Sequence, residues 1–123
     1  MIFVTGPLFA GKEEYICGAL GWSPEEFRKQ AVRDVQELPL SGDLEELADS
    51  LCRYAVVVAT EVGGGVVPVD PEERERRERA GRLSCLLARR AETVIRVQCG
   101  LPQLLKGKLP GPGPELPQEG EEL

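Results

Sequence analysis

The stretch MIFVTGPLFAGK, residues 1–12, decides the fold of this chain. Its first five residues are mostly apolar, rich in β-branched side chains and too few for a helix, so they predict a buried strand. Residues 6–12 match the pattern G-x-x-x-x-G-K, and residues 12–20 have helical character. In this context the loop's N–H groups face phosphate, and its lysine reaches the β- and γ-phosphates of a nucleotide. The candidate nucleotide-binding residues are Gly6, Pro7, Leu8, Phe9, Ala10, Gly11, Lys12 and Glu13.

Position 13 departs from this pattern. A working loop of this kind has Ser or Thr there to bind Mg²⁺, whereas this chain has Glu13 followed by Glu14. Two carboxylates at the mouth of the loop repel a triphosphate, and Glu13 is longer than the hydroxyl side chain it replaces. Two interpretations stay open: a loop that binds ATP or GTP with Mg²⁺, and an inherited strand–turn–helix whose phosphate site has decayed.

The rest of the chain alternates between helix and strand patterns. Helices are expected to begin near residues 23, 43 and 70, and strands are expected at residues 54–59 and 93–97. The strand at 54–59 has no polar alternation, which is typical of a parallel strand covered on both faces. Residues 27–38 fit either a helix or an edge strand. We therefore expect an α/β fold with a small, mostly parallel sheet of three strands. Such a sheet leaves open edges, so a homo-oligomer is also expected.

A second candidate site follows the strand at 54–59. The loop beyond the carboxyl end of a parallel strand faces the ligand crevice, which is where Glu61 lies in the sequence. The three consecutive glycines at 63–65 fit close approach to a ligand or a lid, and the alternative is a plain exposed loop. Residues 72–79 are almost wholly charged and fit a solvated helix face with internal ion pairs. Arg82, just beyond them, is the better candidate for contact with an anion.

Composition excludes several classes of function. The net charge of −6 argues against binding to nucleic acid or to anionic membranes. No apolar run approaches the ~20 residues that span a bilayer, and the first residues lack the pattern of a signal peptide, so we expect a cytoplasmic protein. The chain has no histidine and its four cysteines lack metal-site spacing, so no protein metal centre is expected. The cysteines are expected to be buried. Residues 1–105 are expected to form one domain, and the Pro-, Gly- and Glu-rich residues 106–123 a disordered tail.

Three segments together resemble the bifunctional adenosylcobinamide kinase/adenosylcobinamide-phosphate guanylyltransferases of cobalamin biosynthesis. The first is the strand and loop of residues 1–12. The second is ATEVGGGVVP at residues 59–68, which follows the family's T-N-E-V-G-x-G-[IV]-V-P except at its first two positions. The third is Ala80-Gly81-Arg82 followed by the strand ending near residue 97. The resemblance covers roughly residues 1–20 and 54–105.

The resemblance implies a P-loop-containing nucleotide-hydrolase-like three-layer sandwich that phosphorylates adenosylcobinamide, with nucleotide and a corrinoid intermediate as partners. It implies catalytic roles for Lys12 and Glu61 and substrate contacts for Gly63, Gly65 and Arg82.

Departures from the family limit what this chain can do. Residues 21–53 replace a longer middle region, in which the carboxylate expected to assist Mg²⁺ has no evident counterpart. The family transfers guanylyl groups through a histidine, which this chain lacks. The kinase step is therefore the activity expected. The alternatives are a non-catalytic pseudoenzyme that acts as a binding subunit of the cobalamin pathway, and an unrelated small α/β interaction protein.

Overall fold

A computed structural model describes residues 1–62 and 69–111 of the chain. Its elements are β1 (Ile2–Gly6), α1 (Lys12–Leu20), α2 (Pro24–Gln30), β2 (Ala31–Val32), the 3₁₀ turn η1 (Val35–Glu37), α3 (Leu44–Leu51), β3 (Val56–Thr60), α4 (Pro71–Arg90), β4 (Thr93–Gln98) and β5 (Leu101–Lys106).

The sheet has the strand order β2-β3-β1-β4-β5. The first four strands run parallel, so that Ile2 of β1 pairs with Val56 on one side and Thr93 on the other. β5 returns antiparallel beside β4. The carboxyl ends of the four parallel strands therefore meet along one edge of the sheet, as the α/β prediction requires.

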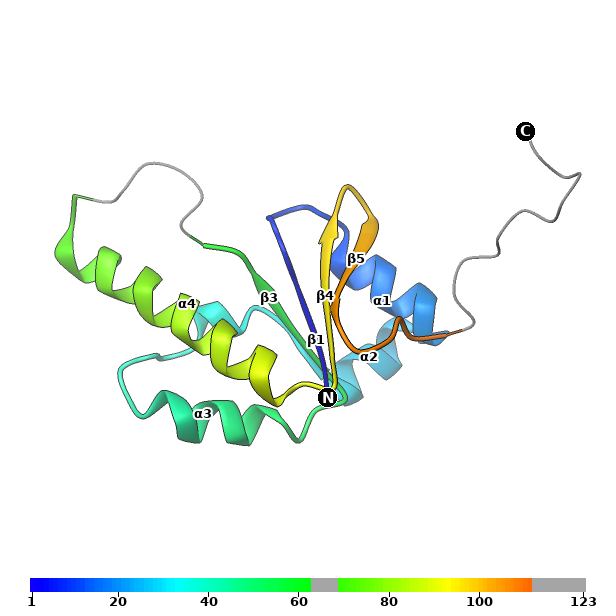
Figure 1. Ribbon diagram of the computed structural model, residues 1–123, viewed down its shortest axis with the longest axis horizontal. Helices are drawn as coiled ribbons and strands as arrows, with labels where there is room; N and C mark the ends of the chain where they lie inside the picture. The colour runs from blue at the N-terminus through cyan, green and yellow to red at the C-terminus, as the bar shows by residue number, and fades with distance from the viewer. Residues whose placement is uncertain (63–68, 112–123) are drawn as a thin grey trace, which may run out of the picture.

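Helices cover both faces of this sheet, which gives three layers (Figure 1). Successive residues of β1 point to opposite faces, as the period of a strand dictates. Phe3 belongs to the core cluster under α3 and α4, and Val4 belongs to the cluster under α1 and α2. Both side chains are at most 2 % exposed. The predicted three-layer α/β architecture is confirmed.

Capping residues set the starts of three helices. Ser23, Asp43 and Asp70 occupy the N-cap positions of α2, α3 and α4, and each accepts a hydrogen bond from a backbone N–H of the first turn. The predicted helix starts are confirmed at all three.

The expectation of three strands is wrong, because the sheet has five. β2 is only two residues long and begins where α2 ends, so it is too short to produce a recognisable sequence pattern. β5 contains Pro102 and is exposed throughout, which hides it from a search for buried runs. Cys99 and Gly100 connect it to β4 with φ angles of 53° and 73°, as in a two-residue hairpin turn.

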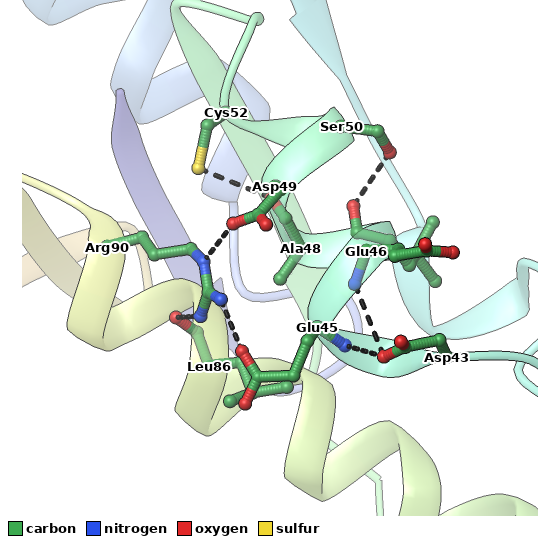
Figure 2. Close-up of polar contacts among 10 residues, drawn as sticks. Asp43, Glu45, Glu46, Ala48, Asp49, Ser50, Cys52, Leu86 and Arg90 are labelled. Atoms are coloured by element: carbon green, nitrogen blue, oxygen red, sulfur yellow. Dashed lines mark hydrogen bonds and ion pairs between the residues drawn. The ribbon is translucent and has the colours of Figure 1, made fainter.

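A clamp of charged side chains joins α3 to α4 on the outer surface of their layer. Figure 2 shows Arg90 of α4 reaching Asp49 and Glu45 on α3. The Nε–Oδ1 distance to Asp49 is 2.7 Å, and Arg90 also donates to the carbonyl of Leu86 on its own helix. The hydrogen bonds to Asp49 and then Glu45 raise the pKa of Arg90 above its ordinary value. This clamp bridges two helices that share one apolar cluster.

The described chain continues past residue 105. Lys106 ends β5 and donates to the carbonyls of Ala88 and Arg89 at the end of α4. Leu109 packs against the cluster under α1 and α2. Most of the predicted tail, residues 112–123, lies outside the described residues.

The expectation that the cysteines are buried is wrong, because two of the four are only partly buried and two are exposed. Cys17 and Cys52 are partly buried, whereas Cys85 and Cys99 are exposed, and all four are free thiols. Cys85 lies on α4 away from the buried stripe of Leu83 and Leu87, and Cys99 lies in the hairpin turn. No described helix is both long and apolar enough to cross a membrane.

Candidate functional site

The phosphate-loop motif lies at the carboxyl edge of the sheet, between β1 and α1. Gly6 ends β1 with a φ of 151°, and Gly11 precedes the helix with a φ of 84°. Two backbone hydrogen bonds hold the loop to its neighbours. The Glu61 N–H donates to the Gly6 carbonyl over 2.9 Å, and the Gly100 N–H donates to the Ala10 carbonyl over 2.8 Å. The loop is therefore fixed by the strands on both sides of β1.

Lys12 is buried at the start of α1. Only 8 % of the residue is exposed, and its Nζ donates to the Pro7 carbonyl over 2.7 Å. Burial lowers the pKa of Lys12, although nearby carboxylates, led by Asp34 and Glu61, oppose the shift. The first turn of a helix directs backbone N–H groups and a partial positive charge outward, so Lys12 adds a full charge where the backbone already favours anions.

A cavity of ≈ 350 Å³ opens beside the loop. Its lining residues are Leu8, Phe9, Ala10, Gly11, Lys12, Glu13, Glu14, Arg33, Asp34, Val58 and Thr60. The predicted loop residues from Leu8 to Glu13 thus share one cavity, with Gly6 and Pro7 directly behind it in the chain. The volume is within the range of small-ligand sites.

Glu13 is paired within this cavity. The Nη1 atom of Arg33 donates to both of its carboxylate oxygens, at 2.8 Å and 3.1 Å. The negative charge that departs from the motif is therefore neutralised by a residue 20 positions away. Sequence reasoning missed Arg33, because it falls in the stretch with an ambiguous pattern.

Asp34 also reaches this edge of the sheet, two residues after the end of β2. It adopts a left-handed φ of 55° and is held by Gln36, whose side-chain nitrogen donates to Asp34 over 3.5 Å. Gln36 is itself 8 % exposed and its side-chain oxygen accepts from the Thr60 N–H over 2.9 Å, which ties η1 to the end of β3. Asp34 therefore brings a carboxylate to the lining of the cavity that contains Lys12. The signal in the sequence that could have located Asp34 is an acidic residue two positions after the short apolar pair Ala31-Val32.

Glu61 follows β3 and pairs with Arg96 of β4. The Arg96 Nη2 donates to Glu61 Oε2 over 3.0 Å, and Nε donates to the other carboxylate oxygen. These hydrogen bonds raise the pKa of Arg96. Glu61 lies close enough to Lys12 to act on its charge, but its carboxylate is engaged by arginine.

Arg82, another predicted contact, is not brought to this cavity. Arg82 projects from the exposed side of α4, pairs with Glu78 over 2.6 Å, and lines a separate cavity of ≈ 680 Å³ near the start of α3. Gly63 and Gly65 lie outside the described residues. Within the described ranges, no group of three or more His, Cys, Asp or Glu side chains could hold a metal ion by itself.

A family model described as cobinamide kinase / cobinamide phosphate guanyltransferase matches residues 26–105. The match includes residues 26–53, where the sequence alone showed no resemblance, and it begins after the phosphate-loop motif. No curated protein matches the chain.

Proposed function

This chain belongs to the cobinamide kinase / cobinamide phosphate guanyltransferase family, and from that membership we propose that it binds ATP or GTP and phosphorylates a corrinoid alcohol such as adenosylcobinamide. The observation that supports this most is the placement of Lys12. It is buried at the N-terminus of α1, beside the carboxylate of Asp34 and in a cavity with the phosphate-loop residues. The positive charge of Lys12 and the backbone N–H groups at the start of α1 meet there. Phosphoryl transfer requires such groups around the phosphate.

In this proposal the chain's own residues position and neutralise phosphate. Lys12 leaves the Pro7 carbonyl and donates to the β- and γ-phosphates, and the backbone of residues 6–11 surrounds them. Pro7 has no N–H, so the first turn of α1 supplies the missing donors. Glu61, which Arg96 holds at the end of β3, faces the same edge and is proposed to orient the acceptor. Substrate roles for Gly63 and Gly65 rest on resemblance alone, and the position of Arg82 leaves it out of this cavity.

Mg²⁺ fits this site through Asp34. In nucleotide sites Mg²⁺ is held by one or two carboxylates together with phosphate oxygens and water, so a complete protein cage is not needed. Asp34 lines the cavity together with Glu14, whereas the third carboxylate there, Glu13, is paired with Arg33. When bound, Mg²⁺ supplies charge neutralisation at the transferring phosphate.

A second candidate is a non-catalytic binding subunit of the same pathway. Glu13 favours it, because this carboxylate stands where the motif has a hydroxyl ligand for Mg²⁺. The lack of histidine excludes the histidine-linked guanylyl transfer that the resemblance implies, so neither candidate includes that step.

Assembly and location belong to the same proposal. β5 presents exposed apolar side chains at the sheet edge, with Leu101 70 %, Leu104 41 % and Leu105 55 % exposed. We propose that a second copy of the chain covers this edge, and a strictly monomeric mass by light scattering would contradict it.

Four free thiols fit a reducing, cytoplasmic compartment.

Calorimetric titration of ATP and GTP, with and without Mg²⁺, tests the binding. We expect the native chain to bind and Lys12→Ala to bind about 10- to 100-fold more weakly, the loss of one charge-assisted contact. Lys29→Ala is the matched control, because Lys29 is exposed on α2, outside the residues that line this cavity. Transfer of labelled γ-phosphate to adenosylcobinamide then separates the two candidates. Binding without transfer supports the non-catalytic subunit.

A further inference from the structure

The pair formed by Arg33 and Glu13 has an unusual position for a surface ion pair. Both side chains line the cavity that contains Lys12. A single nitrogen, Arg33 Nη1, contacts both carboxylate oxygens, at 2.8 Å and 3.1 Å. The guanidinium therefore already holds two anionic oxygens at the mouth of the phosphate loop.

The sheet topology explains how Arg33 reaches this place. β2 runs parallel to β3, with Ala31 opposite Val56 and Val32 opposite Val57. Arg33 follows β2 at once, so it emerges at the same carboxyl edge as the loop after β1. Its side chain is 56 % exposed and that of Glu13 is 34 % exposed, so solvent screens their attraction. Exposed pairs of this kind contribute little and exchange partners readily.

The charged side chains that line the cavity determine how many cations are available to a bound anion. The carboxylates of Glu13, Glu14 and Asp34 line it together with two cations, Lys12 and Arg33. If Arg33 stays on Glu13, Lys12 alone remains to neutralise a bound anion. If a phosphate takes the place of the Glu13 carboxylate, both cations face it. Arginine suits either partner, since its planar fork matches carboxylate and phosphate oxygens alike.

We propose that Arg33 is a second phosphate-binding residue of this site, and that Glu13 occupies its guanidinium until a nucleotide phosphate displaces it. This inference rests on the proposed function, because it needs a nucleotide in the cavity. It gives Glu13, the residue that departs from the motif, a role in setting the affinity for nucleotide. Glu13 competes with the ligand and does not bind it.

A double-mutant cycle tests the proposal. Affinities for ATP and GTP with Mg²⁺ are measured by calorimetry for the native chain, Glu13→Gln, Arg33→Gln and the variant with both changes. We expect Glu13→Gln to bind more tightly than the native chain, because it releases Arg33 and removes a repelling charge. In the Glu13→Gln background, Arg33→Gln is expected to weaken binding about 10-fold or more, the loss of a charge-assisted contact. Arg28→Gln, an exposed change on α2 that also removes one positive charge, is the control.

Measuring the effect of Arg33→Gln in the Glu13→Gln variant distinguishes two roles of Arg33. If Arg33 only shields Glu13, its removal weakens binding in the native chain but changes nothing once Glu13 is neutral. Equal affinities for Glu13→Gln and the double variant, with both folded by circular dichroism, would overturn the inference and leave the proposed function standing. If no folded variant, Glu13→Gln included, binds either nucleotide, the proposed function fails and this inference fails with it.

Discussion

Replacing Gly6 by alanine tests whether the glycines of the loop serve the fold as well as the ligand. A Cβ atom on Gly6 would lie 2.2 Å from the carbonyl oxygen of Val97 on β4, and the residue has a φ of 151°. This oxygen belongs to the backbone of a paired strand, so it cannot move away from the added Cβ as a flexible side chain could. Strain at such a φ costs about 1–3 kcal/mol and forced overpacking about 1–3 kcal/mol more. We therefore expect Gly6→Ala to lower the free energy of unfolding by about 2–6 kcal/mol, out of a typical total of roughly 5–15 kcal/mol.

Two other glycines in the same segment provide graded controls. Gly11 has a φ of 84°, but its Cβ would meet only Gly100, with Cα at 3.4 Å and N at 3.7 Å, so Gly11→Ala should cost about 1–2 kcal/mol. Gly18 lies on the exposed side of α1 with nothing within 4 Å of the added atom. Gly18→Ala should therefore stabilise the helix by about 0.5–1 kcal/mol.

Urea unfolding measures all three changes in one assay. Trp22, the single tryptophan, is partly buried against the cluster under α1 and α2, so its fluorescence should report the transition. The order of midpoints should be Gly18→Ala above the native chain, then Gly11→Ala, then Gly6→Ala. A Gly6→Ala midpoint equal to that of the native chain would refute the argument, because β1 and β4 would then tolerate an atom at 2.2 Å.

Three further predictions concern charge, thiols and the core. Because burial lowers the pKa of Lys12 below 10.5, nucleotide affinity should fall as pH rises through that lowered pKa, and calorimetry should find no such fall in Lys12→Arg. Over the same interval Lys12 is more protonated in the unfolded chain than in the native chain, so its own contribution to the free energy of unfolding should rise with pH, whereas the raised pKa values of Tyr15 and Cys17 act in the opposite direction. Thiol labelling followed by mass spectrometry should modify the exposed Cys85 and Cys99 before Cys17. The reason is that burial and nearby carboxylates raise the pKa of the Cys17 thiol. Early labelling of Cys17 would contradict its packing. Leu87→Ala should cost about 2–5 kcal/mol in urea unfolding, since Leu87 is 0 % exposed on the buried face of α4. A change below ~1 kcal/mol would show that the surrounding side chains fill the space left by the leucine.

The central strands could be predicted because their sequences carry the whole signal. Val56, Val57 and Val58 are at most 2 % exposed, which leaves no polar alternation in β3. β2 and β5 could not be predicted, because each depends on a neighbour. The two residues of β2 are a strand only through pairing with Val56 and Val57, and β5 is exposed throughout and is placed by its register with β4.

The same distinction explains which parts of the site were found. Lys12 and Glu13 belong to one contiguous motif, so their proximity follows from the sequence. Arg33 and Asp34 come together with them only because the strand order places β2 in the same sheet as β1, with β3 between them. The partnership of Glu61 with Arg96 likewise depends on β3 and β4 flanking β1 on opposite sides. No local pattern specifies that order.

The position of β1 has a consequence for how the chain must be made. β1 lies in the middle of the sheet, yet both of its neighbours come later in the sequence, and β4 ends only at Gln98. During synthesis Phe3 and Val4 therefore have no complete partner surface until most of the chain has been added. Folding should then be a single late event, because pairing over such separations costs loop entropy before it gains contacts. Any fragment that stops before residue 93 should carry an open apolar strand edge and aggregate.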